Sequence, residues 1–127
     1  MSRLTACQIA WIPALALLGL TLSSAALAED AAAAEAAFEK FAKSWVADLQ
    51  RQAANERSGA IRYTAYDPAA VATQLQATGK DAAPFVGTLT YTQVVYQCQT
   101  SEQKNCQKVE SSPVTEIFPF QDGRWRY

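Results

Sequence analysis

Two cysteines carry the clearest chemistry in this sequence. Cys98 and Cys106 lie eight positions apart, and a pair of thiols in an exported chain forms a disulfide under oxidising conditions. Redox motifs instead favour only two residues between the cysteines, and metal sites need more ligands than two thiols. The spacing predicts a structural bridge, with a redox pair and a metal site as the alternatives.

Catalytic groups are scarce. The chain has no histidine, which is the commonest general base, and no serine lies in a glycine-flanked nucleophile elbow. The 12 acidic residues include no pair that stands out by spacing, although paired carboxylates can come from distant parts of a chain. We expect a protein that is not an enzyme and that uses neither a cofactor nor a metal.

Glu116 is the most unusual single residue. Strict alternation along a strand from Val114 to Phe120 places its carboxylate among aromatic side chains, where an unpaired charge is costly. One interpretation is a polar group at the mouth of a small-molecule pocket. The other is a side chain that reaches solvent near Pro113 or pairs with an arginine. The aromatic set itself predicts a core beneath a helix: Phe118, Phe120, Trp125 and Tyr127.

Two tyrosines, Tyr66 and Tyr96, are the candidate contacts with a ligand or a partner. We expect both on the outer face of the sheet, and tyrosine is favoured in interfaces. A solvated sheet face explains them equally well. Beside them runs a row of alternating threonines: Thr88, Thr90 and Thr92.

The amino-terminal segment has the pattern of a secretory signal. Residues 1–28 combine Arg3, an uncharged apolar stretch over residues 9–22 and an Ala-x-Ala site that ends at Ala28. The stretch is shorter than the roughly 20 residues that cross a bilayer. We therefore expect cleavage, no stable membrane anchor and a periplasmic or secreted protein with one domain over residues 29–127. The net charge of −1 gives no electrostatic reason to bind nucleic acid.

The elements that must position these residues begin with a helix. It is predicted from Glu29 to Arg57, with Gly59 just after its end as a stop signal. Its large apolar side chains recur every three or four residues, so one face must be buried. These residues are Phe38, Phe41, Ala42, Trp45, Leu49 and Ala53.

Strands are predicted over residues 60–66 and 85–98, because β-branched and aromatic residues suit a pleated, half-buried surface. Residues 68–78 fit two patterns. Asp67 before Pro68, with Gly79 as terminator, suits a short helix. Alternating apolar and polar residues suit a strand that turns into residues 85–98, and we favour the strand.

The disulfide also predicts a register. Pairing across it places Val95 opposite Val109 and Gln97 opposite Gln107, with both valines toward the core and the bridge outside. The strand over residues 85–98 turns Leu89 toward the core.

A β-bulge near Gln93 is the alternative, because this polar residue interrupts the inward-facing set. Such a bulge would turn the side chains after it to the opposite face of the sheet and would bury Val94 and Tyr96 instead. The register therefore decides whether Tyr96 belongs to the core or to a contact surface.

Asp122-Gly123 predicts a two-residue type I′ hairpin turn. That turn pairs Gln121 with Arg124 and Phe120 with Trp125. Pro113, which cannot donate to a ladder, predicts a bend or bulge after residues 106–111 and before a further strand over residues 114–120.

One long helix followed by mostly antiparallel strands predicts an α+β domain with the helix packed on a curved sheet. This element order resembles cystatin-like and NTF2-like rolls, in which a sheet wraps a helix. The resemblance covers residues 29–127 and implies shape rather than activity. We expect an exported, non-catalytic module that binds another envelope protein or component. The alternative is a small-molecule carrier with a pocket between helix and sheet near Glu116.

Overall fold

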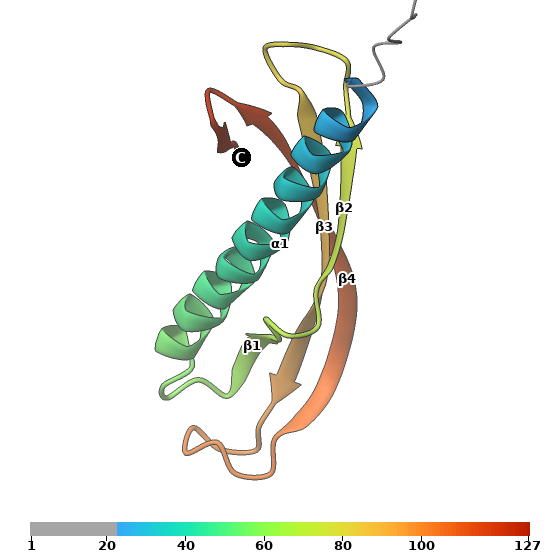
Figure 1. The fold of residues 1–127 in the computed structure, drawn as a ribbon. Coiled ribbons are helices and arrows are strands. Elements are labelled where there is room, and N and C mark those ends of the chain that lie inside the picture. Colours follow the sequence, from blue (N-terminus) through green and yellow to red (C-terminus); the bar gives the residue numbers. More distant parts are fainter. Residues whose placement is uncertain (1–22) are drawn as a thin grey trace, which may run out of the picture.

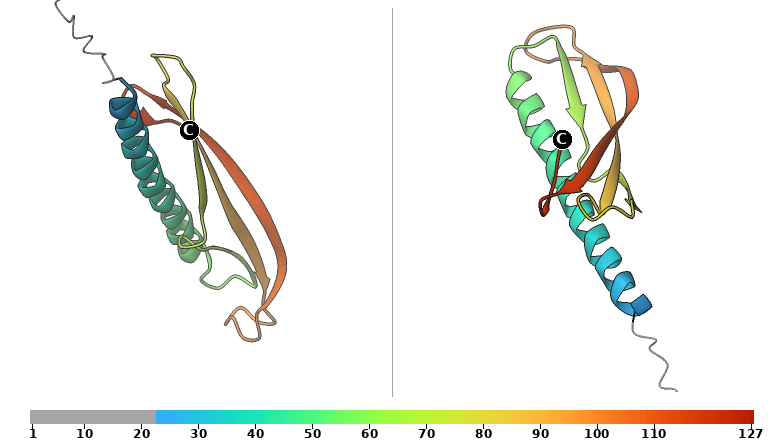
Figure 2. Two further views of the ribbon diagram at one scale, coloured as in Figure 1. Left: turned by 45° about the vertical axis from the view of Figure 1, so that its right-hand side comes forward. Right: turned by 90° about the horizontal axis from the view of Figure 1, so that it is seen from above.

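A computed structural model describes residues 23–127, with side chains from Asp30 onward. One helix packs against the concave side of a curled antiparallel sheet, as Figures 1 and 2 show. The predicted α+β fold is confirmed. The elements are α1 (Ser23–Glu56), β1 (Arg62–Tyr66), β2 (Ala72–Ala77), β3 (Phe85–Gln97), β4 (Gln107–Gln121) and β5 (Arg124–Trp125).

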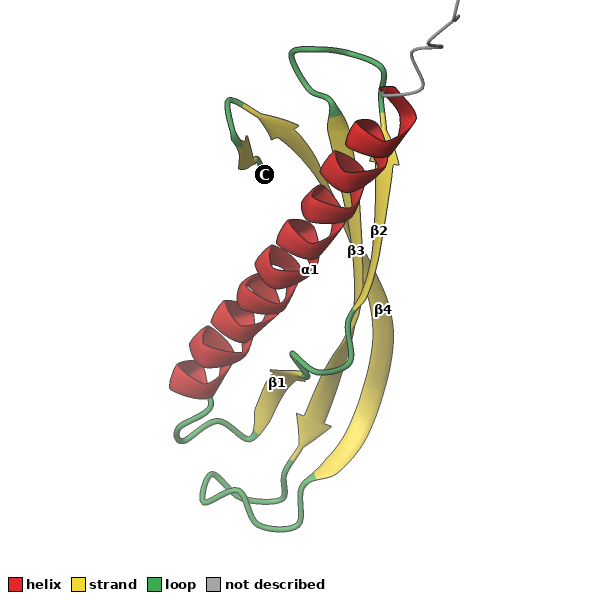
Figure 3. Ribbon diagram, viewed as in Figure 1, coloured by secondary structure: helices red, strands yellow, loops and turns green. Residues whose placement is uncertain are grey.

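The strand β3 is the centre of the sheet. It pairs with β4 on one side, and on the other side with β2 along its first half and β1 along its second half. Figure 3 shows β2 and β1 following one another along this side. The predicted strand within residues 68–78 is confirmed by β2, so the helical alternative is wrong there.

The helix begins earlier than predicted. It starts at Ser23 rather than Glu29 and so runs through the predicted cleavage site after Ala28. The remainder of the predicted signal, residues 1–22, lies outside the described residues. After the helix, Gly59 has a φ of 74°, a left-handed conformation that suits glycine near a helix end.

The core lies where the buried stripe of α1 meets β3 and β4. Phe38 and Val46 on the helix are fully buried, as are Leu89 on β3 and Phe118 on β4. A Cβ at Gly87 would overlap the ring of Phe38. The absence of a side chain at Gly87 therefore lets the ring lie directly on the backbone of β3.

The register near the disulfide differs from the prediction because β4 contains one extra residue. Gln97 pairs with Gln107 as expected, but Val95 lies opposite Glu110. The register shift makes Val109 an extra residue of β4, a β-bulge. Val95 is buried, whereas Val109 is 52% exposed, so the prediction that both valines face the core is wrong for Val109.

The alternative of a bulge near Gln93 is also wrong. Tyr91 and Val95, two residues to either side, are both buried, so alternation continues unbroken through Gln93. The irregularity lies between Val95 and Tyr96. Tyr96 stays on the outer face and is half-buried.

The carboxy-terminal hairpin forms as predicted. Asp122 and Gly123 have φ values of 52° and 74°, as both central residues of a type I′ turn require. Both residue pairs predicted from this turn are present. The hairpin brings the ring of Trp125 to 4.6 Å from that of Phe38, so it closes the core on one side of the helix.

Candidate functional site

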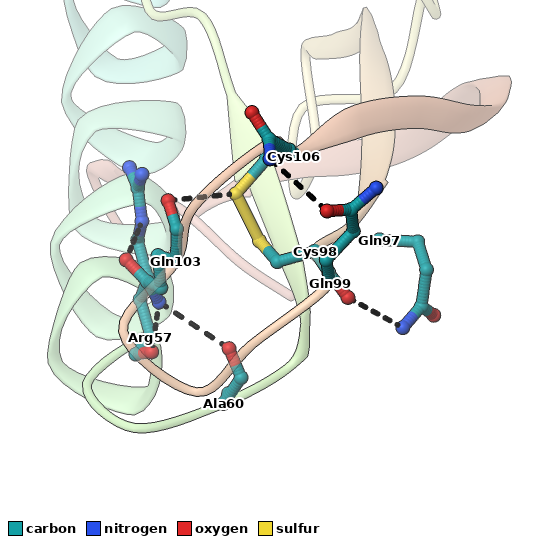
Figure 4. The surroundings of a disulfide bond; sticks show 8 residues. Arg57, Ala60, Gln97, Cys98, Gln99, Gln103 and Cys106 are labelled. Carbon is teal, nitrogen blue, oxygen red and sulfur yellow. Dashed lines mark hydrogen bonds between the residues drawn. A yellow bond between two sulfur atoms is a disulfide. The ribbon is translucent and has the colours of Figure 1, made fainter.

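The predicted disulfide joins Cys98 and Cys106. Figure 4 shows it at the base of the loop between β3 and β4, close to the end of α1. Cys98 is 4% exposed and Cys106 is half-buried, so the expectation that the bridge lies on the outside is wrong. The bridge is shielded from solvent because the loop folds back toward the helix.

Gln103 anchors this loop to the end of α1. Its Nε2 donates to the backbone carbonyls of Arg57 and Ala60, and Arg57 Nε donates to Gln103 Oε1 at 2.8 Å. Gln103 adopts a φ of 58°, which is uncommon for a non-glycine residue. The sequence indicated only an exposed polar loop, and no local pattern distinguishes Gln103 from its polar neighbours.

The guanidinium of Arg57 also lies 4.1 Å from the centre of the Tyr63 ring. Tyr63 in turn stacks on Tyr96, with ring centres 5.1 Å apart and planes 15° from parallel. The cation and two stacked rings tie the helix end to the neighbouring strands β1 and β3. Tyr96 thus has an intramolecular partner in addition to its exposed surface.

Tyr66 does not share the outer face with Tyr96, and that placement was wrong. Tyr66 pairs with Gln93 in the sheet, and its ring meets the buried Tyr91 edge-on at 5.8 Å. Its backbone N–H donates to Gln50 Oε1 at 2.7 Å. Tyr66 therefore packs toward the helix.

Tyr66 and Tyr96 nevertheless both border one hollow of about 250 Å³ at the end of β1. A second hollow, of about 360 Å³, lies between β2 and β3 and is bordered by Gln74, Thr88 and Thr90. Both hollows are open rather than enclosed, so they are features of a surface and not interior cavities.

Glu116 faces the helix side of the sheet as alternation predicted, and it is half-buried. The hydroxyl of Tyr91 donates to Glu116 Oε1 at 3.3 Å. Burial, together with the negative charge of Glu116, raises the pKa of Tyr91 to about 12. The carboxylate thus has a tyrosine partner instead of the arginine that one interpretation suggested.

Aromatic rings fill the space between helix and sheet on the Phe118 side of Glu116. Trp45 lies 5.1 Å from Phe118 and 5.0 Å from Tyr127, and Phe41 lies 4.9 Å from Phe118. Trp45 Nε1 is buried there without a hydrogen-bond partner. The predicted aromatic core beneath the helix is confirmed for Phe118, and Phe120 and Trp125 are half-buried beside it. The assignment of Tyr127 to this core is wrong, because its side chain is 83% exposed at the edge of the cluster.

The outer face of the sheet has a different composition. The register aligns uncharged residues in rows across β2, β3 and β4, and Thr90 Oγ1 lies 3.3 Å from Thr115 Oγ1. These rows contain no charged side chain from Gln76, next to the loop that joins β2 to β3, as far as Val94. Their members are Gln76, Val86 and Pro119; Gln74, Thr88 and Ile117; Ala72, Thr90 and Thr115; Thr92 and Pro113; and Ala65, Val94 and Ser111.

Within residues 23–127, no group of three or more histidine, cysteine or acidic side chains is arranged to hold a metal ion. In the same range, no helix is both long and apolar enough to cross a membrane. Comparison of the chain with protein-family models, curated proteins and solved structures finds no match.

Proposed function

We propose that this protein is an exported, non-catalytic module that binds another protein of the cell envelope through the outer face of its sheet. The observation that supports this proposal is the uncharged surface of that face, where Ile117 is 62% exposed. The centres of protein interfaces are depleted in charged residues. From Gln76 at the hairpin end of β2 to Val94, the rows of this face contain threonines and no charged residue, which is the composition of such a centre.

The chemistry of the other face supports a non-catalytic role. Its one half-buried carboxylate, Glu116, meets the hydroxyl of Tyr91, and the pKa of that phenol is raised to about 12. A general acid or base works best when its pKa lies near the working pH. Tyr91 is therefore poorly suited to exchange protons at neutral pH.

The alternative of a small-molecule carrier has less support. It required space between helix and sheet near Glu116, but Trp45 and Phe118 pack against each other on one side of that residue. The open hollows bordered by Tyr96 and by Thr88 lie elsewhere in the sheet. A third hollow, of about 510 Å³, lies between the amino-terminal part of α1 and the loop that joins β2 to β3, and it is also open. A carrier would therefore have to hold its ligand against an open surface, whereas small-molecule sites usually bury their ligand deeply.

Export is the first part of the proposal to test. The disulfide is compatible with an oxidising compartment. Expression of the full chain in its native host, fractionation and amino-terminal sequencing should give an envelope or secreted protein that begins at Glu29. Retention of Met1 in a cytoplasmic protein would contradict the proposal.

Binding can be tested by site-specific photo-crosslinking in intact cells. A photoreactive residue at Thr92, which is exposed on the outer face, should give a discrete adduct with one envelope protein. The matched control is the same residue at Lys40, which is exposed on α1. Equal adducts at both positions, or no adduct at Thr92, would argue against a binding role for the outer face.

A further inference from the structure

The strand β4 has a free edge. One side of β4 pairs with β3 from Gln107 to Pro119, whereas the other side pairs with β5 only at Phe120 and Gln121. The backbone of α1 runs closest to β1 and β2, and its side chains reach β4 through the inward-facing Phe118 rather than along the edge of the strand. Figure 1 shows β4 as the outermost strand on the side away from β1. Most of the outward edge of β4 therefore has no neighbouring strand within the described residues.

One hydrogen bond shows which backbone groups point toward this edge. Arg126 N–H donates to the carbonyl of Pro119 at 2.9 Å, so Pro119 directs its carbonyl away from β3. Backbone groups of successive residues alternate between the two sides of a strand. Thr115 and Ile117 have the same parity as Pro119, and β4 has no register shift between them. Their N–H and C=O groups therefore also face the free edge.

The edge is protected over only part of its length. Pro113 has the same parity and lacks an N–H, and the bulge at Val109 twists the strand further along. Proline and bulges are common devices that prevent pairing at a sheet edge. The unprotected part is the short stretch from Val114 to Ile117. It begins directly beyond Tyr127, whose ring lies 5.8 Å from that of Phe118.

We propose that this stretch of β4 binds an extended segment of the partner protein, which adds to the sheet as an antiparallel strand in line with β5. Each of Thr115 and Ile117 would exchange two backbone hydrogen bonds with the residue opposite it. This inference rests on the proposed function, because it assigns the partner a second contact beside the outer face.

Side chains next to the edge define the chemistry of the segment. The residue opposite Ile117 would lie on the outer face and cover an apolar side chain that is 62% exposed. The next residue would lie opposite Glu116, whose carboxylate now accepts a hydrogen bond from Tyr91 at 3.3 Å. Directly opposed side chains are close enough to form an ion pair. The segment should therefore contain an apolar β-branched residue followed by lysine or arginine.

A second copy of this chain does not meet these requirements. A two-fold pairing centred on Glu116 would oppose two carboxylates, which is destabilising. A pairing centred on Thr115 would place Pro113 opposite Ile117, where the proline cannot supply the needed N–H. The edge thus favours a different chain with a basic residue at the central position.

The probe is a short peptide, acetylated and amidated at its ends, with the sequence Thr-Val-Lys-Val-Thr. Titrated into the purified, isotope-labelled protein, it should shift the NMR signals of the Thr115 and Ile117 amides and slow their hydrogen exchange. Replacing the peptide lysine by glutamate should weaken binding several-fold. The variant Glu116→Gln should reduce that difference between the two peptides.

Two matched variants test the role of the backbone. Thr115→Pro removes an outward N–H without removing a bond to β3, and it should abolish peptide binding. Thr115→Val removes the same hydroxyl but keeps the N–H, so it should still bind. Equal binding by both variants, or shifts confined to residues elsewhere, would overturn the inference.

The peptide-binding test of the β4 edge and the crosslinking test of the outer face can fail independently. Adducts at Thr92 without peptide binding at Thr115 would leave the outer face as the binding surface and overturn the edge contact. Peptide binding without adducts at Thr92 would retain the edge and overturn the outer face. Concentration-dependent self-association that Thr115→Pro abolishes would instead identify a second copy as the occupant and would overturn the proposed segment.

Discussion

The two ends of the sheet are fastened to α1 by different chemistry. At the end where β4 meets β5, Phe118 and Trp125 lie against Phe38 and Phe41 in the middle of the helix. At the opposite end, the loop residue Gln103 forms hydrogen bonds with Arg57, just after the helix, and a disulfide closes the same loop. Aromatic burial suffices where a broad sheet lies beneath the helix. A polar loop offers little apolar area, so a covalent bond and hydrogen bonds hold it.

The largest effect should come from the aromatic end. Phe38→Ala removes a fully buried ring that contacts residues of α1, β4 and β5. Substitutions of this kind cost about 3–5 kcal/mol. Chemical denaturation should show this loss in the free energy of unfolding, with Lys40→Ala on the exposed side as the control. A loss below about 1 kcal/mol would show that the aromatic end is not the main attachment.

Removal of the disulfide tests the opposite end. The double variant Cys98→Ser with Cys106→Ser should lose roughly 2.5 kcal/mol, because it frees a short loop in the unfolded chain. Hydrogen exchange should rise first in the loop over residues 99–105 and in the last turn of α1. If exchange rises equally around Phe38, the two ends do not behave as separate attachments.

Gly87→Ala tests how closely the aromatic end is packed. The new methyl group would overlap the Phe38 ring, and such overpacking typically costs about 1–3 kcal/mol. Phe38→Leu shortens the side chain beneath it, so the double variant should be more stable than the sum of the two single effects predicts. Additive losses would show that the overlap with Phe38 is not the source of the Gly87→Ala cost.

Tyr91 and Glu116 lie between the two ends and should make the stability of the fold depend on pH. The pKa of the folded Tyr91 is raised to about 12, whereas an unfolded tyrosine titrates near about 10. The unfolded chain therefore loses this proton first, and stability present below pH 10 is lost as the pH rises toward 12. The slope should be at most about 1.4 kcal/mol per pH unit. Denaturation of Tyr91→Phe across this range should show a shallower decline than the parent protein.

The smallest effect should come from the hydrogen bonds of the loop. Gln103→Ala removes the donor to the carbonyls of Arg57 and Ala60, at a cost of about 0.5–1.5 kcal/mol. Ser101→Ala, at an exposed position of the same polar loop, serves as the matched control. Because Gln103 positions the loop rather than the core, protease cleavage within residues 99–105 should increase more than global unfolding does.

Periodicity was enough to predict the aromatic end of the molecule. Apolar spacing in α1 identified Phe38 and Phe41 as inward-facing, and the turn at Asp122-Gly123 determined how Trp125 returns to them. These patterns are local, because helix faces and two-residue turns depend on neighbouring residues.

The other end depends on contacts that no local pattern encodes. The bulge at Val109 and the docking of Gln103 onto Ala60 both require β1, β3 and the helix end to be in place. Tyr66 was assigned to the wrong face because β1 carries a tyrosine on each side, Tyr63 and Tyr66. Only its pairing with β3 shows which of them faces the helix.

The position of Trp125 and Phe118 also has a consequence for the order of folding. The ring of Phe38 completes its packing only against Phe118 of β4 and Trp125 of β5, which come much later in the sequence. During synthesis or translocation, which deliver the chain from its amino terminus, α1 must keep this apolar surface uncovered until β4 and β5 emerge. Exposed apolar surface of this kind promotes aggregation of partly folded chains. The nascent protein should therefore depend on a holding chaperone until β5 is released.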